Sequence, residues 1–157
     1  MSVKIIFISL IITLALTFFF MLNRTKIPSA LVCTAKNHIS LNTQKDGVKI
    51  EGEVLLVFRV SSVRDGVFSQ VGVLDVNGKN YSVNRSTTLR FSGQDSDGYL
   101  RTQRVNVVKN DNDDLPDAIT DLLMSKQKVF YYKIMHISDN VYGVRDLRRT
   151  LMVCRAK

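Results

Sequence analysis

The chain has 157 residues, a formal net charge of +8 and 2 cysteines. This length suits one globular domain, which needs neither a metal nor a dense disulfide framework to fold. The basic residues are interspersed with acidic ones and lack the stacking aromatic residues of a nucleic-acid surface, so we expect no nucleic-acid partner.

The first predicted element is a hydrophobic helix. The 18 residues from Ile5 to Leu22 carry no charge, and as a helix they would span about 27 Å, close to the thickness of a bilayer core. The segment ends in bulky residues rather than the small residues of a cleavage site, so residues 1–26 are predicted to form an uncleaved signal anchor with its flanks. Lys4 opposes Arg24 and Lys26, so these charges alone leave the orientation open.

A short linker is predicted at residues 27–30, where Pro28 stops the helix, and a β-rich domain at residues 31–157. Alternation of apolar and polar residues and the Asn77-Gly78 turn predict eight strands. One amphipathic helix is predicted between the fifth and the sixth strand. The strands are expected at 31–40, 50–60, 67–76, 80–84 with an extension through 91, 99–109, 129–137, 141–147 and 150–154, and the helix at 115–125.

The fold class that follows is mainly β, with an N-terminal transmembrane helix and one helix in the domain. Eight short strands joined by hairpins predict a small antiparallel sheet. This sheet either closes into a lipocalin-like barrel or stays open and curved against the helix. The sequence leaves both arrangements open.

The two cysteines bracket the domain, with Cys33 near its start and Cys154 near its end. A disulfide between them would join the first strand to the last, and it would persist only in an oxidising compartment such as the periplasm. The alternative is a pair of reduced, buried cysteines that pack as small hydrophobic residues. We favour the disulfide and therefore a periplasmic domain.

No residue set in the chain predicts a reaction, and we expect no catalytic residue, cofactor or metal ion. His38 and His136 lack the spacing of a metal pair and are interpreted as strand or surface residues. Asp111, Asp113 and Asp114 lack the glycine of a calcium loop and are interpreted as caps of the following helix.

One aromatic strand offers a candidate ligand cavity. Phe130, Tyr132 and Ile134 alternate along it and share one face. Such a stripe is typical of a barrel core, and the alternative is the lining of a cavity for an apolar small molecule.

The segments LVCTA, VGVLDVNGKNYSVNR and MVCRAK, together with the anchor, resemble the FidL-like membrane proteins of enteric bacteria. The resemblance implies a single-pass protein of the bacterial inner membrane. It also implies a periplasmic accessory role, because some members are encoded beside membrane-bound regulators of the ToxR and CadC type. The layout is more distantly similar to the lipocalin-like partners of such regulators.

We therefore expect a membrane-anchored, non-enzymatic accessory or binding module, with an inner-membrane regulatory protein as its partner. Three alternatives remain at this stage. One is a periplasmic enzyme, and another is a lipocalin-like carrier of a small molecule. The third, less favoured, is a cytoplasmic domain whose excess of basic residues binds nucleic acid.

Overall fold

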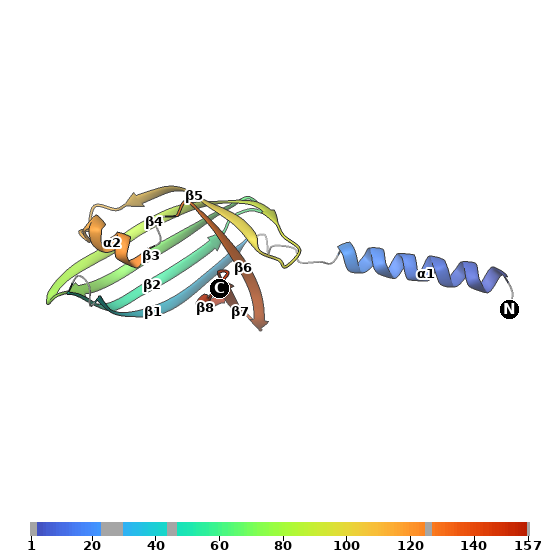
Figure 1. Cartoon of the computed structure of the whole chain (residues 1–157), viewed down its shortest axis with the longest axis horizontal. Helices are drawn as coiled ribbons and strands as arrows, with labels where there is room; N and C mark the ends of the chain where they lie inside the picture. Colours follow the sequence, from blue (N-terminus) through green and yellow to red (C-terminus); the bar gives the residue numbers. More distant parts are fainter. Residues whose placement is uncertain (1–2, 23–29, 44–46, 125–126, 157) are drawn as a thin grey trace.

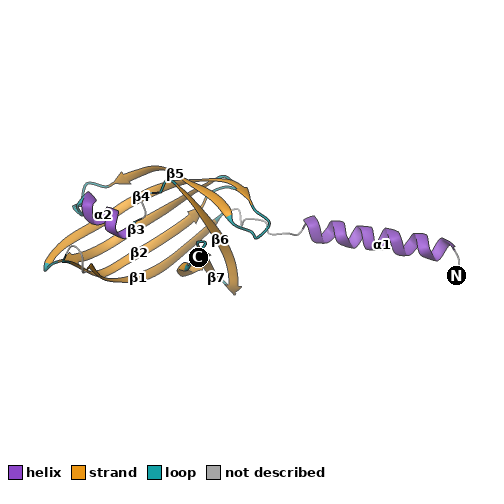
Figure 2. Cartoon of the chain, in the orientation of Figure 1, coloured by secondary structure: helices purple, strands orange, loops and turns teal. Residues whose placement is uncertain are grey.

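The structure, a computed structural model, describes residues 3–22, 30–43, 47–124 and 127–156. An N-terminal helix, α1, is separated in the chain from a β domain that contains one short helix, α2 (Figures 1 and 2). The elements are α1 (Val3–Leu22), β1 (Leu31–Thr43), β2 (Val48–Val60), β3 (Asp65–Val76), β4 (Lys79–Gln94), β5 (Leu100–Lys109), α2 (Asp117–Leu123), β6 (Val129–Ser138), β7 (Val141–Arg145) and β8 (Thr150–Ala156). Their number and order confirm the predicted eight strands, with a helix after the fifth.

The eight strands form a closed antiparallel barrel in which each strand pairs with its neighbours in the chain and β8 pairs with β1. Closure decides between the two arrangements that the sequence left open. Judged on the described residues alone, neither helix combines the length and apolar character required to cross a membrane. The predicted linker at 27–30 falls outside the described residues, except for Ala30.

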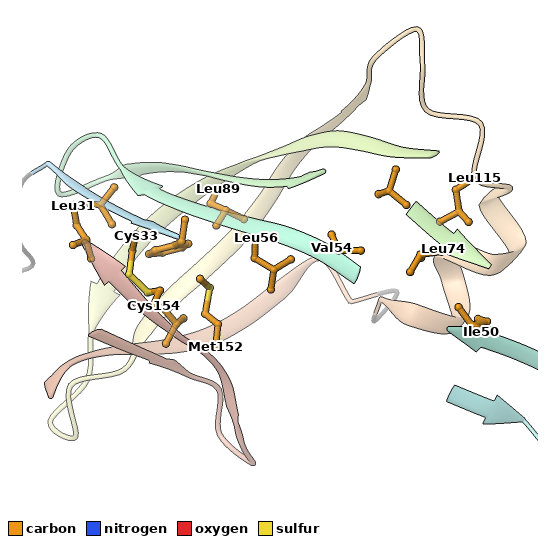
Figure 3. Packing of buried hydrophobic residues seen from close by; sticks show 14 of the residues in the cluster. Leu31, Cys33, Ile50, Val54, Leu56, Leu74, Leu89, Leu115, Met152 and Cys154 are labelled. Atoms are coloured by element: carbon orange, nitrogen blue, oxygen red, sulfur yellow. A yellow bond between two sulfur atoms is a disulfide. The ribbon is translucent and has the colours of Figure 1, made fainter. Parts of the chain in front are cut away.

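Alternation along the strands builds the core. On β2 the side chains of Val54, Leu56 and Phe58 are buried, whereas Glu53 and Leu55 on the opposite face are exposed. This agrees with the period of two in the sequence, because successive residues of a strand point to opposite faces. Figure 3 shows the resulting core, which extends from Leu31 and the two cysteines to Leu74 and Leu115.

Two elements differ in length from their prediction. β4 is one continuous strand that reaches Gln94, three residues beyond the predicted end at residue 91. The helix predicted over 115–125 is confined to Asp117–Leu123, because Pro116 is its N-terminal flank and Met124 returns to an extended conformation.

The barrel has two different ends. The leading end, where β1 begins, carries the loops at 61–64 and 95–99 and the turn at 139–140. The helix end carries α2 and the turn at 77–78 (Figure 1).

The circle of eight strands is complete only toward the leading end. β5 pairs with β6 only over Leu100–Gln103, and β1 pairs with β8 only at Cys33 and Thr34. Toward the helix end, the barrel wall therefore consists of the five long strands β1 to β5. Side chains of Leu115, Ile119 and Leu123 pack against the core there.

Candidate functional site

The seam between β1 and β8 is held by a disulfide between Cys33 and Cys154, with a Cα–Cα distance of 5.4 Å. Both cysteines are buried, and Figure 3 shows the bond inside the barrel beside Leu31. The predicted pairing is confirmed. Since only two residue pairs join β1 to β8, the covalent bond strengthens the shortest seam of the barrel.

A buried ion pair joins the barrel wall to the segment before α2. The Arg85 side chain is 2% exposed and that of Asp113 is fully buried. Arg85 donates from Nε to Asp113 Oδ2 at 2.7 Å and from Nη2 to Asp113 Oδ1, which is a bidentate arrangement. A third bond runs from Arg85 Nη1 to the Thr120 hydroxyl of α2. One guanidinium therefore fixes both the loop and the helix.

The aspartates before α2 do not cap it, which corrects our interpretation of Asp113 and Asp114. The helix has no side-chain capping bond at its N-terminus. Instead, Asp113 accepts from the Asn84 backbone N–H at 2.9 Å, and Asp114 accepts from the Ser82 backbone N–H at 2.6 Å. The reason is that these carboxylates lie along β4, where backbone donors and the Arg85 charge are available.

The ionisation of Asp113 follows from these contacts. Burial by itself would raise the pKa of Asp113, but hydrogen bonds from Arg85 and the Asn84 N–H, together with the charges of Arg85 and Lys109, hold the pKa below its usual value. Asp113 is therefore a carboxylate at neutral pH. Both members of this pair are used in holding the fold.

The predicted cavity residues Phe130, Tyr132 and Ile134 lie on β6. Tyr132 and Ile134 pack against the core, and the Phe130 and Tyr132 rings are stacked with centroids 5.8 Å apart. The Arg104 guanidinium lies 5.0 Å from the centre of the Phe130 ring. Burial raises the pKa of Tyr132, and the nearby charge of Arg104 opposes that rise.

Arg104 has one side-chain hydrogen-bond donor without an acceptor among the described residues. Its Nε is buried and has no hydrogen-bond partner among the described residues. An unpaired buried donor of this kind is uncommon, because it loses its bond to water without replacement. The sequence offered one signal for Arg104 and for Arg85, which is their placement on the alternation that otherwise points apolar residues inward.

The two histidines are both exposed and lie on different strands. His38 is on β1, opposite Glu53, and His136 is on β6, in edge contact with Tyr142 at 5.2 Å. Their interpretation as strand surface residues is confirmed. Within the part of the chain that the structure describes, no three acidic, cysteine or histidine side chains converge as metal ligands do.

Two surface hollows are lined by residues other than the predicted cavity set. An open one of about 610 Å³ lies at the leading end, next to Arg64, Asp65 and Arg90. A smaller one of about 200 Å³ lies on the outer face of β2 and β3, between Val57 and Val67.

The outer face of β2 and β3 is apolar beyond this smaller hollow. Leu55 and Val71 are exposed and directly opposite each other, and Val73 is 51% exposed beside them. We call these three residues the outer apolar face. Exposed apolar residues that cluster in this way are typical of interaction surfaces.

The eight-stranded chain matches the family model described as FidL-like putative membrane protein over residues 72–154. The chain belongs to the FidL-like family. The matched part runs from the middle of β3 to the second cysteine of the disulfide, and it includes Arg85, Asp113 and α2. No curated protein and no solved structure matches the chain.

Proposed function

We propose that this FidL-like protein is a membrane-anchored, non-enzymatic accessory module, whose barrel lies in the periplasm and binds an inner-membrane regulatory protein of the ToxR or CadC type. The observation that carries the proposal is the closed barrel whose seam is held by a disulfide. A bond of this kind persists in an oxidising compartment, which favours the periplasm over the cytoplasm.

The anchor is supported by the sequence of the first helix and by the family description. Ile5 to Leu22 has no charged residue, and the family is described as one of membrane proteins. As a sequence, these 18 residues reach the length that a bilayer span needs, whereas the described residues of α1 taken alone do not meet that requirement. The proposed orientation places the N-terminus in the cytoplasm and the barrel outside.

A binding role is supported by the positions of the ionisable side chains in the barrel. The buried pair Arg85 and Asp113 fixes the loop before α2, and the two histidines are exposed on separate strands. By contrast, the outer apolar face offers surface to another protein. These features favour binding over a reaction.

Co-purification tests the partner. The full-length tagged chain is expressed with a ToxR- or CadC-type regulator in the bacterial inner membrane and extracted in mild detergent. We expect stoichiometric recovery of the regulator with the barrel, and no recovery when the tag is carried by α1 and its flanks alone. Loss of the regulator under every mild condition would refute the proposed role.

Labelling of the cysteines tests the compartment. A membrane-impermeant maleimide is added to spheroplasts before and after reduction under mildly denaturing conditions. We expect two labels per chain after reduction and none before, because Cys33 and Cys154 are bonded. Labelling that needs membrane disruption but no reductant would place the barrel in the cytoplasm.

A second candidate function, a lipocalin-like carrier of an apolar anion, is favoured by one observation. The unpaired Nε of Arg104 lies beside the aromatic rings of β6, so a carboxylate on an apolar molecule could satisfy it. A fluorescent fatty-acid analogue tests this by titration. We expect binding to weaken about tenfold in Arg104→Gln, the loss of one charged hydrogen bond, and no binding to either protein would remove this candidate.

A further inference from the structure

Most of one edge of β1 has no paired strand among the described residues. β2 covers one side of β1 along its whole length, but β8 reaches only Cys33 and Thr34 on the other side. From Lys36 to Asn42, no backbone group in the described part of the chain, other than those of β2, hydrogen-bonds to β1. Unpaired edges of this kind are templates for another strand.

The hydrogen bonds at the end of β2 show which groups of β1 point to this edge. Lys49 donates its backbone N–H to Asn77 Oδ1 and accepts from the Asn77 N–H, so its backbone faces β3. Antiparallel bonds alternate along a strand, so Ile50 and every second residue after it face β1. Their partners Asn37, Ile39 and Leu41 therefore bond to β2.

The alternate residues of β1 direct their backbone groups to the open edge. These residues are Lys36, His38, Ser40 and Asn42, and all four are exposed. The row of N–H and C=O groups from Lys36 to Asn42 is called the open edge below. It presents four donors and four acceptors to whatever lies beside it.

We propose that an extended segment of the partner protein pairs with the open edge as an additional β-strand. This inference rests on the proposed function, which supplies a protein partner. Such strand addition derives its affinity from backbone hydrogen bonds and its specificity from alternate side chains. The short β1–β8 seam leaves the added strand room toward the helix end, where the barrel wall lacks β6 to β8.

The chemistry of the segment follows from the faces of β1. On the inner face, Ile39 and Leu41 are only partly buried against the core, so alternate residues of the segment should be apolar. On the outer face, Lys36 of β1 is already paired with Glu53 of β2, with Nζ 3.2 Å from Oε2, and His38 lies opposite the same Glu53. The other residues of the segment should therefore be polar.

A second copy of this chain fits the edge less well. Identical edges pair most simply as antiparallel strands centred on Ile39, the middle of the open edge, so the two β1 starts, each eight residues before Ile39, would lie about 53 Å apart. The eight residues between Leu22 and Leu31 span at most about 30 Å. With the strands upright on the membrane, both anchors could not enter the same bilayer.

The test uses the full-length chain and the regulator that co-purifies with it. Ser40→Pro removes one N–H of the open edge and leaves the bonds to β2 in place, and proline is tolerated on edge strands. Ser40→Val keeps the N–H and is the matched control. We expect Ser40→Pro to lower regulator recovery at least about tenfold, the equivalent of one to two backbone hydrogen bonds, and Ser40→Val to lower it less than about twofold.

Hydrogen exchange of the wild-type complex gives a readout that does not depend on the folding of a variant. The amides of Lys36, His38, Ser40 and Asn42 should exchange fast in the free protein and become protected on binding, whereas those of Asn37, Ile39 and Leu41 should be protected in both states. Unchanged exchange at the four edge amides would overturn the inference.

The remaining outcomes separate the inference from the proposed function. If Ser40→Pro binds normally and Leu55→Ser with Val73→Ser does not, the partner uses the outer apolar face and the inference alone is wrong. If differently tagged copies capture each other through Ser40 and no regulator is recovered, the occupant is a second copy. If the wild-type chain recovers neither the regulator nor a second copy of itself, the proposed function is wrong, and the inference is wrong with it.

Discussion

At the scale of single residues, Arg85 is the charge around which the helix end is organised. Its guanidinium makes two bonds to Asp113 and one to Thr120 from a fully buried position. A buried charge without its partner is costly, because the lost hydration is not replaced. The loop before α2 is therefore held by electrostatics as much as by apolar packing.

Removing one charge of this pair should destabilise the barrel. In Asp113→Asn, Arg85 keeps its charge but loses its counter-ion, and we expect the free energy of unfolding to fall by about 3 kcal/mol. Urea titration in detergent, followed by tyrosine fluorescence, measures it, since the chain has no tryptophan. Asp114→Asn is the control and should cost about 1 kcal/mol or less, because Asp114 is bonded to a backbone N–H at the surface.

The same pair predicts a pH dependence. The pKa of Asp113 is lowered in the folded protein, so its contribution to stability is complete above the unfolded pKa of about 3.9 and is lost as the pH falls through the folded pKa. The difference in unfolding free energy between wild type and Asp113→Asn should therefore shrink below about pH 4. A difference that stays constant from pH 7 to pH 2.5 would contradict this assignment.

The sequence could not predict the pair, although it predicted the elements that carry it. Arg85 and Asp113 are 28 residues apart, and no local pattern links them. The aspartates stand directly before a helix, so a local interpretation favours capping. Only the placement of Arg85 between the inward-facing Val83 and Thr87 indicated that a buried acid was needed.

At the scale of elements, α2 depends on its apolar contacts with the helix end of the barrel. The helix has seven residues and none of them is buried, and a helix this short is unstable alone. Leu115, which precedes it, is 2% exposed and belongs to the core. We infer that Leu115, with Ile119 and Leu123, keeps the helix in place.

Truncation of Leu115 should therefore lower the free energy of unfolding more than truncation of Leu122 on the helix surface does. Leu115→Ala removes a buried side chain and should lower the unfolding free energy by about 2–4 kcal/mol. Leu122 is 41% exposed, and Leu122→Ala should change the unfolding free energy by less than about 0.5 kcal/mol. Equal losses in the same urea titration would show that Leu115 is not part of the core.

Predictions from the sequence were accurate for strands and less accurate for the helix. On β2, Ile50, Val54, Leu56, Phe58 and Val60 share one face and the charged residues Glu51, Glu53 and Arg59 share the other. The Asn77-Gly78 turn fixes the register of β3 and β4, so both features were recognisable locally. The helix ends depend on Pro116 and on the return of Met124 to an extended conformation. That return is a consequence of tertiary packing, which a pattern over ten residues does not contain.

At the scale of the whole molecule, the sequence predicted a closed barrel only as one of two possible arrangements of the sheet. Hairpins predict which strands are neighbours, but whether β8 meets β1 depends on the twist and curvature of the entire sheet. The two cysteines were the one signal that the first and last strands meet. They were correctly interpreted because they bracket the domain.

The disulfide should supply a large share of the stability. It closes a loop with a sequence separation of 121 residues, which the chain-entropy estimate values at about 4–5 kcal/mol. Cys33→Ala with Cys154→Ala should lower the unfolding free energy by about this amount. Unfolding of reduced wild type in urea is the control, and a cost below about 1 kcal/mol would show that the strand pairs alone hold the seam.

The position of this seam also determines the order in which the strand pairs can form during folding. Hairpins from β1 to β5 are local and can form as each strand becomes available, whereas the β1–β8 contact joins distant parts of the chain and is slow. In the proposed orientation the N-terminus stays in the cytoplasm and the barrel is translocated from β1 onward, so Cys33 reaches the periplasm before Cys154 and stays unpaired until Cys154 follows. During that interval the unfinished sheet is exposed to aggregation and to wrong thiol partners, so ring closure should be the step at which an oxidising enzyme or a chaperone has the greatest effect on yield.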